Sequence, residues 1–228
     1  FSARICEAIA AFVDPETPQM KSTASIGVAI HPNDGADPEE LLRNADLAMY
    51  KAKGEGGNAY CLFAADMQAR ARSAMSLETD LRTALANDEF VLYYQPQFDV
   101  STNAIIGVEA LLRWNRPGVG IVGPGAFLPQ AEENGLIIPI GRWVLEDACR
   151  QARTWIDDGV LSGTLAVNIS GVQVRRGDLV TMVREVLAAT GFPAAQLELE
   201  VTEGFIMGET EQAVATLTEL RDMGLTLA

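Results

Sequence analysis

The chain has 228 residues, 48% hydrophobic and 21% charged, which is typical of a globular protein with one large domain or parts of two. Its formal net charge of −14 argues against DNA or RNA as a partner, because a nucleic-acid surface needs a basic footprint. The three cysteines, Cys6, Cys61 and Cys149, form no CxxC pair, so neither a zinc site nor a disulfide framework is indicated, and a reducing compartment fits.

The two ends of the chain suggest a piece of a longer protein. It begins at Phe1 rather than Met and ends at Ala228 inside an apolar run. No apolar run reaches membrane-spanning length and no signal peptide is visible, so a cytoplasmic location is expected. A membrane anchor in missing N-terminal segments of the parent protein stays compatible with this expectation.

Residues 1–63 are expected to form the first unit. Apolar spacing over 4–13 predicts a helix, and weak alternation over 22–30 predicts a strand. The Gly-rich stretch 54–57 follows a helix, which favours a helix end and a loop over a phosphate-binding turn. His31, the only histidine, lies in a Pro-Asn-Asp-Gly turn and is expected to be structural, so histidine-based triad catalysis has no support.

One helix in this unit has clear start and stop signals. Asp37 is expected to cap it, Pro38 occupies the first position, and Glu40 completes a capping box. Gly54 is expected to end it.

The second half alternates between strands and helices. Residues 64–76 read as a connector helix, and residues 77–228 as a second domain that opens with a helix over 77–86. The predicted strands and helices that follow are strands 90–95, 105–112, 165–169 and 197–201, and helices 140–156, 179–189 and 210–223. This order predicts an α/β fold built on a parallel sheet or barrel.

Three of the predicted strands end in an oxygen-bearing side chain, namely Glu109, Asn168 and Glu200. Polar groups at the carboxyl ends of barrel strands converge on one mouth, and carboxylate and carboxamide oxygens are suited to Mg²⁺, Mn²⁺ or Ca²⁺. Taken singly, each residue fits a solvated strand end or a turn equally well. Glu198 shares a strand face with Glu200 and is an alternative ligand.

Arg113 and Gln95 are candidates for contacts to a substrate. Arg113 is predicted to share a strand face with Glu109, where a guanidinium can bind phosphate bidentately. The alternative is a surface arginine that packs beside Trp114. Gln95 can contact a base edge or cap an edge strand.

Five stretches in the second half carry a family resemblance: Tyr93–Pro96, Glu109–Trp114, Phe127–Glu133, Val167–Ser170 and Glu200–Glu203. With these motifs in order, residues 77–228 resemble the N-terminal part of an EAL domain, the cyclic di-GMP phosphodiesterase family. The resemblance implies a TIM-like (β/α) barrel and hydrolysis of cyclic di-GMP to linear pGpG with Mg²⁺ or Mn²⁺.

The same resemblance implies roles for individual residues. Glu109, Asn168 and Glu200 look like metal ligands, and Gln95 and Arg113 look like substrate contacts. Glu203 resembles the glutamate that steadies the loop after the fifth barrel strand, and it joins Glu109 and Glu200 as a catalytic candidate.

The first half resembles a different family. Ser25–Ala29 and Ala45–Lys53 are similar to motifs in the C-terminal part of a GGDEF domain, the diguanylate cyclase family. The expected fold is therefore a partial barrel preceded by the C-terminal part of an α+β GGDEF domain. Gly57 stands before Asn58 where that family commonly has Arg, which implies the loss of one phosphate contact.

The resemblance also implies that part of the EAL site lies beyond this chain. The family's Asp-Asp-Phe-Gly run would begin just past Ala228, so the fragment alone is expected to fold poorly and to be inactive. The alternative to an enzyme is a non-catalytic cyclic di-GMP receptor or interaction scaffold with degenerate domains. Full-length relatives in this family suggest a homodimer through the EAL domain and an upstream sensory domain.

Overall fold

The computed structural model describes residues 1–12, 22–54, 56–176, 178–201 and 211–228. Contacts divide the chain into two units, Phe1–Ser76 and Leu77–Ala228, and each is described by itself. No helix within the described ranges is long and apolar enough to cross a bilayer.

The first unit is a small α+β assembly. Its elements are α1 (Ser2–Ala11), β1 (Ile26–Val28), α2 (Pro38–Gly54), β2 (Tyr60–Leu62) and the start of α3 (Ala65–Ala86). Strands β1 and β2 pair in parallel, and α2 packs on both. Gly27 permits this packing, because a Cβ there would lie 1.8 Å from the carbonyl oxygen of Ala45 on α2.

The predicted capping of α2 is confirmed. The Glu40 backbone N–H donates to Asp37 Oδ1 at 2.8 Å, and Glu40 Oε2 accepts from the Ala36 N–H at 2.8 Å. The helix begins at Pro38 and ends at Gly54, as the sequence predicts.

Helix α3 is longer than the sequence analysis expected. The predicted connector, 64–76, and the predicted opening helix, 77–86, form one continuous helix over Ala65–Ala86. The stretch contains no Gly or Pro that would interrupt it. The helix therefore begins in the first unit and ends in the second.

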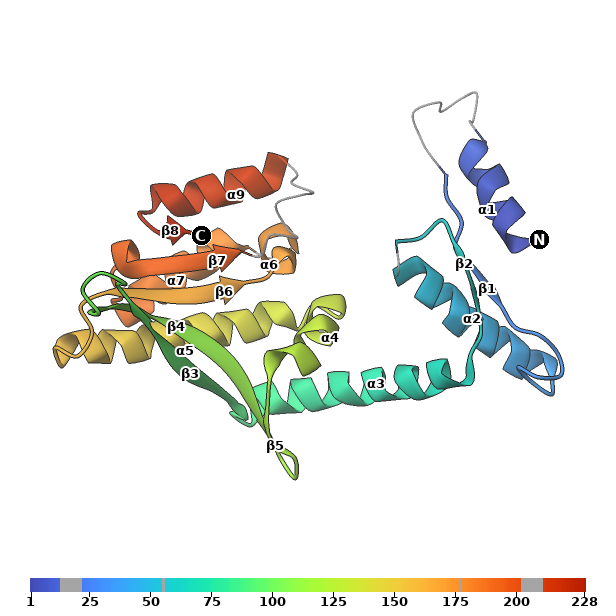
Figure 1. Cartoon of the computed structure of the whole chain (residues 1–228), viewed down its shortest axis with the longest axis horizontal. Helices are drawn as coiled ribbons and strands as arrows, with labels where there is room; N and C mark the ends of the chain where they lie inside the picture. Colours follow the sequence, from blue (N-terminus) through green and yellow to red (C-terminus); the bar gives the residue numbers. More distant parts are fainter. Residues whose placement is uncertain (13–21, 55, 177, 202–210) are drawn as a thin grey trace. The chain divides into compact units, whose positions relative to one another are not determined.

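The second unit is a mixed sheet with helices (Figure 1). Its strands are β3 (Phe90–Phe98), β4 (Ile105–Arg116), β5 (Gly120–Val122), β6 (Thr164–Ile169), β7 (Leu197–Val201) and β8 (Thr226–Leu227). Its α-helices are α4 (Leu128–Glu133), α5 (Ile137–Asp157), α6 (Gly171–Arg176), α7 (Leu179–Thr190) and α9 (Glu211–Asp222), and Pro124–Ala126 and Ala194–Gln196 form short 3₁₀ turns. The strand order is β3-β4-β6-β7-β8, with β5 paired to β4, which is an α/β fold and part of a TIM-like barrel.

The sheet is parallel except at one side. Strands β4, β6, β7 and β8 run parallel, but β3 and β5 are both antiparallel to β4. The connections at 99–104 and 117–119 are too short for a crossover, which needs a dozen or more residues, so they close hairpins. The second of these hairpins ends in strand β5.

The two faces of this sheet differ. Side chains such as Trp114, Val167 and Leu199 are at most 1% exposed and belong to one hydrophobic core with the helices. Helix α5 packs against β3, β6 and α7 on that side. We call this the helix-covered face. The alternate side chains of the same strands point to the opposite side, which we call the inner face.

An aromatic cluster anchors the helix-covered face near α4. The Phe127 ring centroid lies 5.8 Å from that of Trp114 and 5.9 Å from that of Phe90, and Trp143 of α5 contacts Phe90 at 6.0 Å. Trp114 also donates its Nε1–H to Glu89 at 3.0 Å. Phe127, part of a motif quoted for the EAL resemblance, thus has a packing role here.

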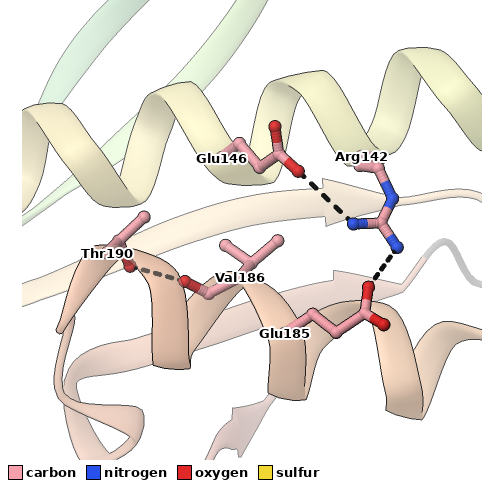
Figure 2. Close-up of polar contacts among 5 residues, drawn as sticks. All are labelled: Arg142, Glu146, Glu185, Val186 and Thr190. Atoms are coloured by element: carbon pink, nitrogen blue, oxygen red, sulfur yellow. Dashed lines mark hydrogen bonds and ion pairs between the residues drawn. The ribbon is translucent and has the colours of Figure 1, made fainter.

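Ion pairs join the helices on their outer surface. Arg142 of α5 contacts Glu185 of α7 at 2.6 Å and Glu146 of its own helix at 3.4 Å (Figure 2). Arg184 of α7 contacts Glu219 of α9 at 3.2 Å. These pairs join partly exposed side chains of α5, α7 and α9.

Candidate functional site

The predicted side chains gather on the inner face because of the strand register. Gln95 of β3 pairs with Glu109 of β4, and Glu109 pairs with Ala166 of β6. Two residues further along β6, Asn168 pairs with Glu200 of β7. Paired residues point to the same face, so these side chains form a row across four strands.

Direct interactions connect three members of this row. Asn168 Nδ2 donates to Glu109 Oε1 at 2.7 Å, across 59 positions of sequence. The pKa of Glu200 is raised above its usual value by partial burial first, and then by the charges of Glu109 and Glu198. Glu109, Asn168 and Glu200 therefore lie together, with Glu198 close enough to repel Glu200.

Glu109 does not stand at the end of its strand, contrary to the sequence prediction. Strand β4 continues to Arg116, because beyond the site it pairs with β3 and β5. Its parallel partner β6 pairs only with Gly107–Ala110. Glu109 is thus at the edge of the parallel part of the sheet, while Asn168 and Glu200 are each one residue from a strand end.

Glu198 and Glu200 are distinguished by register. Glu198 pairs with Ala166 and Thr226, whereas Glu200 pairs with Asn168. Glu198 therefore sits two residues deeper along β7, between Ala166 of β6, which has no side-chain oxygen, and Thr226 of β8. Register thus favours Glu200 over Glu198 as the partner of Asn168, and the Glu109 charge that helps to raise the pKa of Glu200 indicates that Glu200 is near Glu109 as well.

Arg113 lies on the same face as Glu109 but is not brought into contact with it. Four residues of strand separate the two, about 13 Å of rise. The Arg113 guanidinium donates to the Leu112 carbonyl at 2.8 Å and lies 5.6 Å from the centre of the Tyr93 ring. The Arg116 guanidinium stacks over Trp114, 4.9 Å from the centre of the ring. The packing against Trp114 that was the alternative for Arg113 is therefore found at Arg116.

Two further candidates are placed differently. Gln95 is exposed on β3 as the cross-strand neighbour of Glu109, so it borders the row. Glu203 falls outside the described residues, and its predicted role stays a prediction.

A pocket of about 370 Å³ opens beside the row. Its polar lining comes from Glu109, Asn168, Ser170, Gln173 and Glu132. Its apolar lining comes from β4, the 3₁₀ turn at Pro124–Ala126, α4, α5 and β6: Ala110, Leu111, Leu112, Pro124, Leu128, Ile137, Ile140, Gly141, Val144 and Ile169. A carboxylate row next to an apolar hollow can hold a charged group and a flat apolar group of one ligand together.

Sequence reasoning missed Gln173. The signal was present, because Ser170-Gly171-Val172-Gln173 has the Ser-x-x-Gln spacing of a capping box. The short helix α6, which begins at this box, was not predicted. The Ser-x-x-Gln spacing was therefore not recognised as the start of a helix.

The donor set fits a hard divalent cation. Glu109 and Glu200 offer carboxylate oxygens, and the Asn168 hydrogen bond uses Nδ2 and leaves Oδ1 for another partner. The repulsion that raises the pKa of Glu200 is the kind that a cation between the carboxylates relieves. Among the described residues no three His, Cys, Asp or Glu side chains come together as a metal cluster, so this set is two carboxylates and one carboxamide.

Comparison with known families agrees with this fold. Residues 78–228 match the EAL domain, and residues 1–59 match the diguanylate cyclase GGDEF domain. The chain belongs to the EAL domain family. Its EAL region carries the row of Glu109, Asn168 and Glu200, and the GGDEF match precedes it, as in a tandem GGDEF–EAL protein.

Curated relatives of this EAL chain include signalling enzymes. The chain is 44% identical over 210 residues to the bifunctional diguanylate cyclase/cyclic di-GMP phosphodiesterase MucR of Pseudomonas aeruginosa, which covers 92% of this chain and 31% of MucR. It is 35% identical over 206 residues to the cyclic di-GMP phosphodiesterase PdeR of Escherichia coli, covering 90% of this chain and 31% of PdeR. The chain thus spans about a third of the length of these relatives.

Solved structures show the same EAL fold. The MucR phosphodiesterase in complex with cyclic di-GMP aligns with a TM-score of 0.64 at 43% identity, over 67% of this chain and 62% of that chain. The EAL enzyme Bd1971, bound to cAMP and cyclic di-GMP, aligns with a TM-score of 0.66 at 29% identity, over 84% of this chain and 50% of that chain.

Proposed function

We propose that the full-length protein hydrolyses cyclic di-GMP to linear pGpG at the row formed by Glu109, Asn168 and Glu200. The observation that carries the proposal is the hydrogen bond between Asn168 and Glu109, with Glu200 beside them, on an EAL-type sheet. The relatives MucR and PdeR, described as cyclic di-GMP phosphodiesterases, support the same substrate.

The proposed cofactor is Mg²⁺ or Mn²⁺, held by Glu109, Asn168 and Glu200. A divalent cation bound there would lower the pKa of water and offset the charge on a phosphodiester. The reaction adds water to one phosphorus atom and breaks its bond to the 3′ oxygen, which takes up a proton. The linear product keeps a 5′ phosphate, so all atoms are accounted for.

The chain's own groups have distinct tasks in this proposal. The Asn168 carboxamide donates a hydrogen bond to the Glu109 carboxylate and restrains it. The oxygen atoms of these two side chains that would hold the cation therefore stay oriented. The apolar pocket beside the row shelters part of the dinucleotide from water. Arg113, on the same face, contacts the substrate further along β4, and Gln95 contacts it from β3. Glu203 is proposed to steady the loop that follows β7.

The parent protein's setting is also a proposal. We place both units in the cytoplasm, consistent with the free thiols of Cys6, Cys61 and Cys149. A homodimer through the EAL unit and an upstream sensory domain complete the proposed assembly. Light scattering of the full-length protein tests the first of these, since a monomeric mass at micromolar concentration would contradict it.

The decisive experiment compares the full-length protein with its Glu109→Ala variant. Both are incubated with cyclic di-GMP and Mg²⁺ or Mn²⁺, and pGpG is measured by chromatography. We expect the variant to lose at least about 100-fold in rate, because a group that holds the cation contributes several kcal/mol to the transition state. Glu219→Ala, an exposed carboxylate on α9, is the matched control.

The same assay separates the enzyme from a receptor. If the wild-type protein binds cyclic di-GMP but forms no pGpG, the receptor alternative replaces this proposal. If Glu109→Ala hydrolyses as fast as wild type, the role assigned to Glu109 is wrong.

A further inference from the structure

Gln173 closes the turn that follows Asn168. Ser170 Oγ accepts from the Val172 N–H at 3.2 Å, and the Ser170 carbonyl accepts from the Gln173 N–H at 3.0 Å. In return, Gln173 Oε1 accepts from the Ser170 N–H at 3.0 Å. This reciprocal pattern is a capping box, and it fixes the path of the chain two residues after Asn168.

The burial of Gln173 exceeds what a cap requires. Its side chain is 2% exposed, and with Asn44 it is one of two buried polar side chains found in the described ranges. Its Nε2 has no hydrogen-bond partner within that part of the chain. An orphaned buried donor opposes folding, so an exposed cap would serve a short helix better.

Helix α5 is shaped to receive this side chain. A Cβ at Gly141 would lie 2.1 Å from Gln173 Nε2 and 2.8 Å from its Cδ. Glycine weakens a helix interior, and here its missing side chain leaves the space that the carboxamide fills. Gln173 therefore joins α5, α6 and the end of β6 in one packed joint.

This joint borders the candidate site. Gly141, Gln173 and Ser170 line the same pocket as Glu109 and Asn168. Asn168 is itself exposed, so the path of the backbone on either side of it determines where its carboxamide points. Ile169 follows Asn168, and the next residue, Ser170, is held by the Gln173 side chain.

We infer that Gln173, seated in the gap at Gly141, is a positioning residue that sets Asn168 against Glu109. The inference deepens the proposed function and rests on it, because Asn168 matters only if the row binds a cation. Gln173 acts on Asn168 through the turn and is not itself a ligand of the cation. Groups that orient a metal ligand from behind typically change metal affinity by 10–100-fold when they are removed.

The test measures Mn²⁺ binding to the full-length protein without substrate, from the signal of free Mn²⁺ in electron paramagnetic resonance. Melting temperature and pGpG formation are measured in parallel. We expect Gln173→Ala and Gly141→Ala each to weaken Mn²⁺ binding about 10–100-fold. Gly141→Ala keeps every polar group and only displaces the Gln173 carboxamide, so it stands in if Gln173→Ala folds poorly.

A double variant separates positioning from stability. Combining Gly141→Ala with Gln173→Ala removes the clash, so its melting temperature should recover above that of Gly141→Ala alone. Mn²⁺ binding should stay weak, because the acceptor for the Ser170 N–H is still missing. Recovery of Mn²⁺ binding together with the melting temperature would reduce Gln173 to a packing residue and overturn the inference.

Asp178→Ala is the matched control, since Asp178 caps α7 by accepting from the Thr181 N–H at 3.2 Å but does not line the pocket. It should lower the melting temperature and leave Mn²⁺ binding within about twofold. Asn168→Ala identifies which claim fails. If it binds Mn²⁺ like wild type, the proposed ligand set is wrong; if it loses Mn²⁺ while both joint variants keep it, only the positioning role is wrong.

Discussion

The two faces of the β4–β6–β7 sheet use the same strands for opposite purposes. On β7, Leu199 is 1% exposed under the helices, while its neighbour Glu200 points to the inner face among other carboxylates. On β6, Val167 is fully buried, while Asn168 is exposed. On these two strands the buried side chains point to one side and the candidate ligands to the other, one residue apart. A substitution can therefore affect stability and spare the candidate ligands, or the reverse.

The largest effect is expected from Leu199→Ala on the helix-covered face. Removing a fully buried leucine side chain should lower the free energy of unfolding by about 2–5 kcal/mol, because the cavity is only partly refilled. Urea unfolding of the full-length protein, followed at the EAL unit's tryptophans, measures the change. Glu198→Gln on the same strand is the control and should change stability by less than about 1 kcal/mol. Equal losses from the two variants would refute the separation of the faces.

Glu200→Gln probes the inner face through pH. Burial and the charges of Glu109 and Glu198 raise the folded-state pKa of Glu200 above its unfolded value. The folded chain then binds this proton more tightly than the unfolded chain, so stability falls as pH rises through the folded pKa. Without metal, Glu200→Gln should equal or exceed wild type in stability at pH 7, by less than about 1 kcal/mol. The difference should vanish near pH 4.

Cation binding should reverse that order. Unfolding is measured with a chelator and then with excess Mn²⁺, which stabilises only a folded state that binds it. Wild type should gain stability from Mn²⁺, and Glu200→Gln should gain less. A variant that is less stable than wild type at pH 7 in chelator would show that Glu200 is not repelled by its neighbours, and a variant that gains as much from Mn²⁺ would show that Glu200 does not hold the cation.

Local signals predicted much of this fold. The start and end of α2 follow from Asp37, Pro38 and Gly54, because capping depends on residues a few positions apart. Alternation within β4 correctly placed Glu109 and Arg113 on one face. The grouping of Glu109 with Asn168 and Glu200 was expected from strand order alone.

Features that depend on distant partners were not predicted. The full length of β4 comes from its antiparallel pairing with β3 and β5, so Glu109 looked like a strand end. The direction of Arg113 depends on Tyr93 across the hairpin. The buried position of Gln173 depends on the gap at Gly141, 32 positions earlier. None of these contacts between distant residues can be predicted from the local periodicity of hydrophobic residues in the sequence.

The smallest effect is expected on the outer surface of the helices that cover the core. Arg142 bridges α5 and α7 through Glu185, and the hydrogen bond to Glu185 is the main reason that the pKa of Arg142 is raised (Figure 2). Its side chain is 43% exposed, so solvent screens the pair. Arg142→Met should cost at most about 1 kcal/mol in the free energy of unfolding.

Salt dependence tests the origin of that loss. At 1 M salt the screening length shrinks to about 3 Å, so wild type and Arg142→Met should converge. Thr190→Val is a salt-independent control. It removes the hydrogen bond that Thr190 Oγ1 donates to the Val186 carbonyl at 2.8 Å within α7. A loss at Arg142 that persists unchanged in high salt would come from packing of its methylene groups against α7. The outer surface of the helices would then contribute to stability by packing and not only through ion pairs.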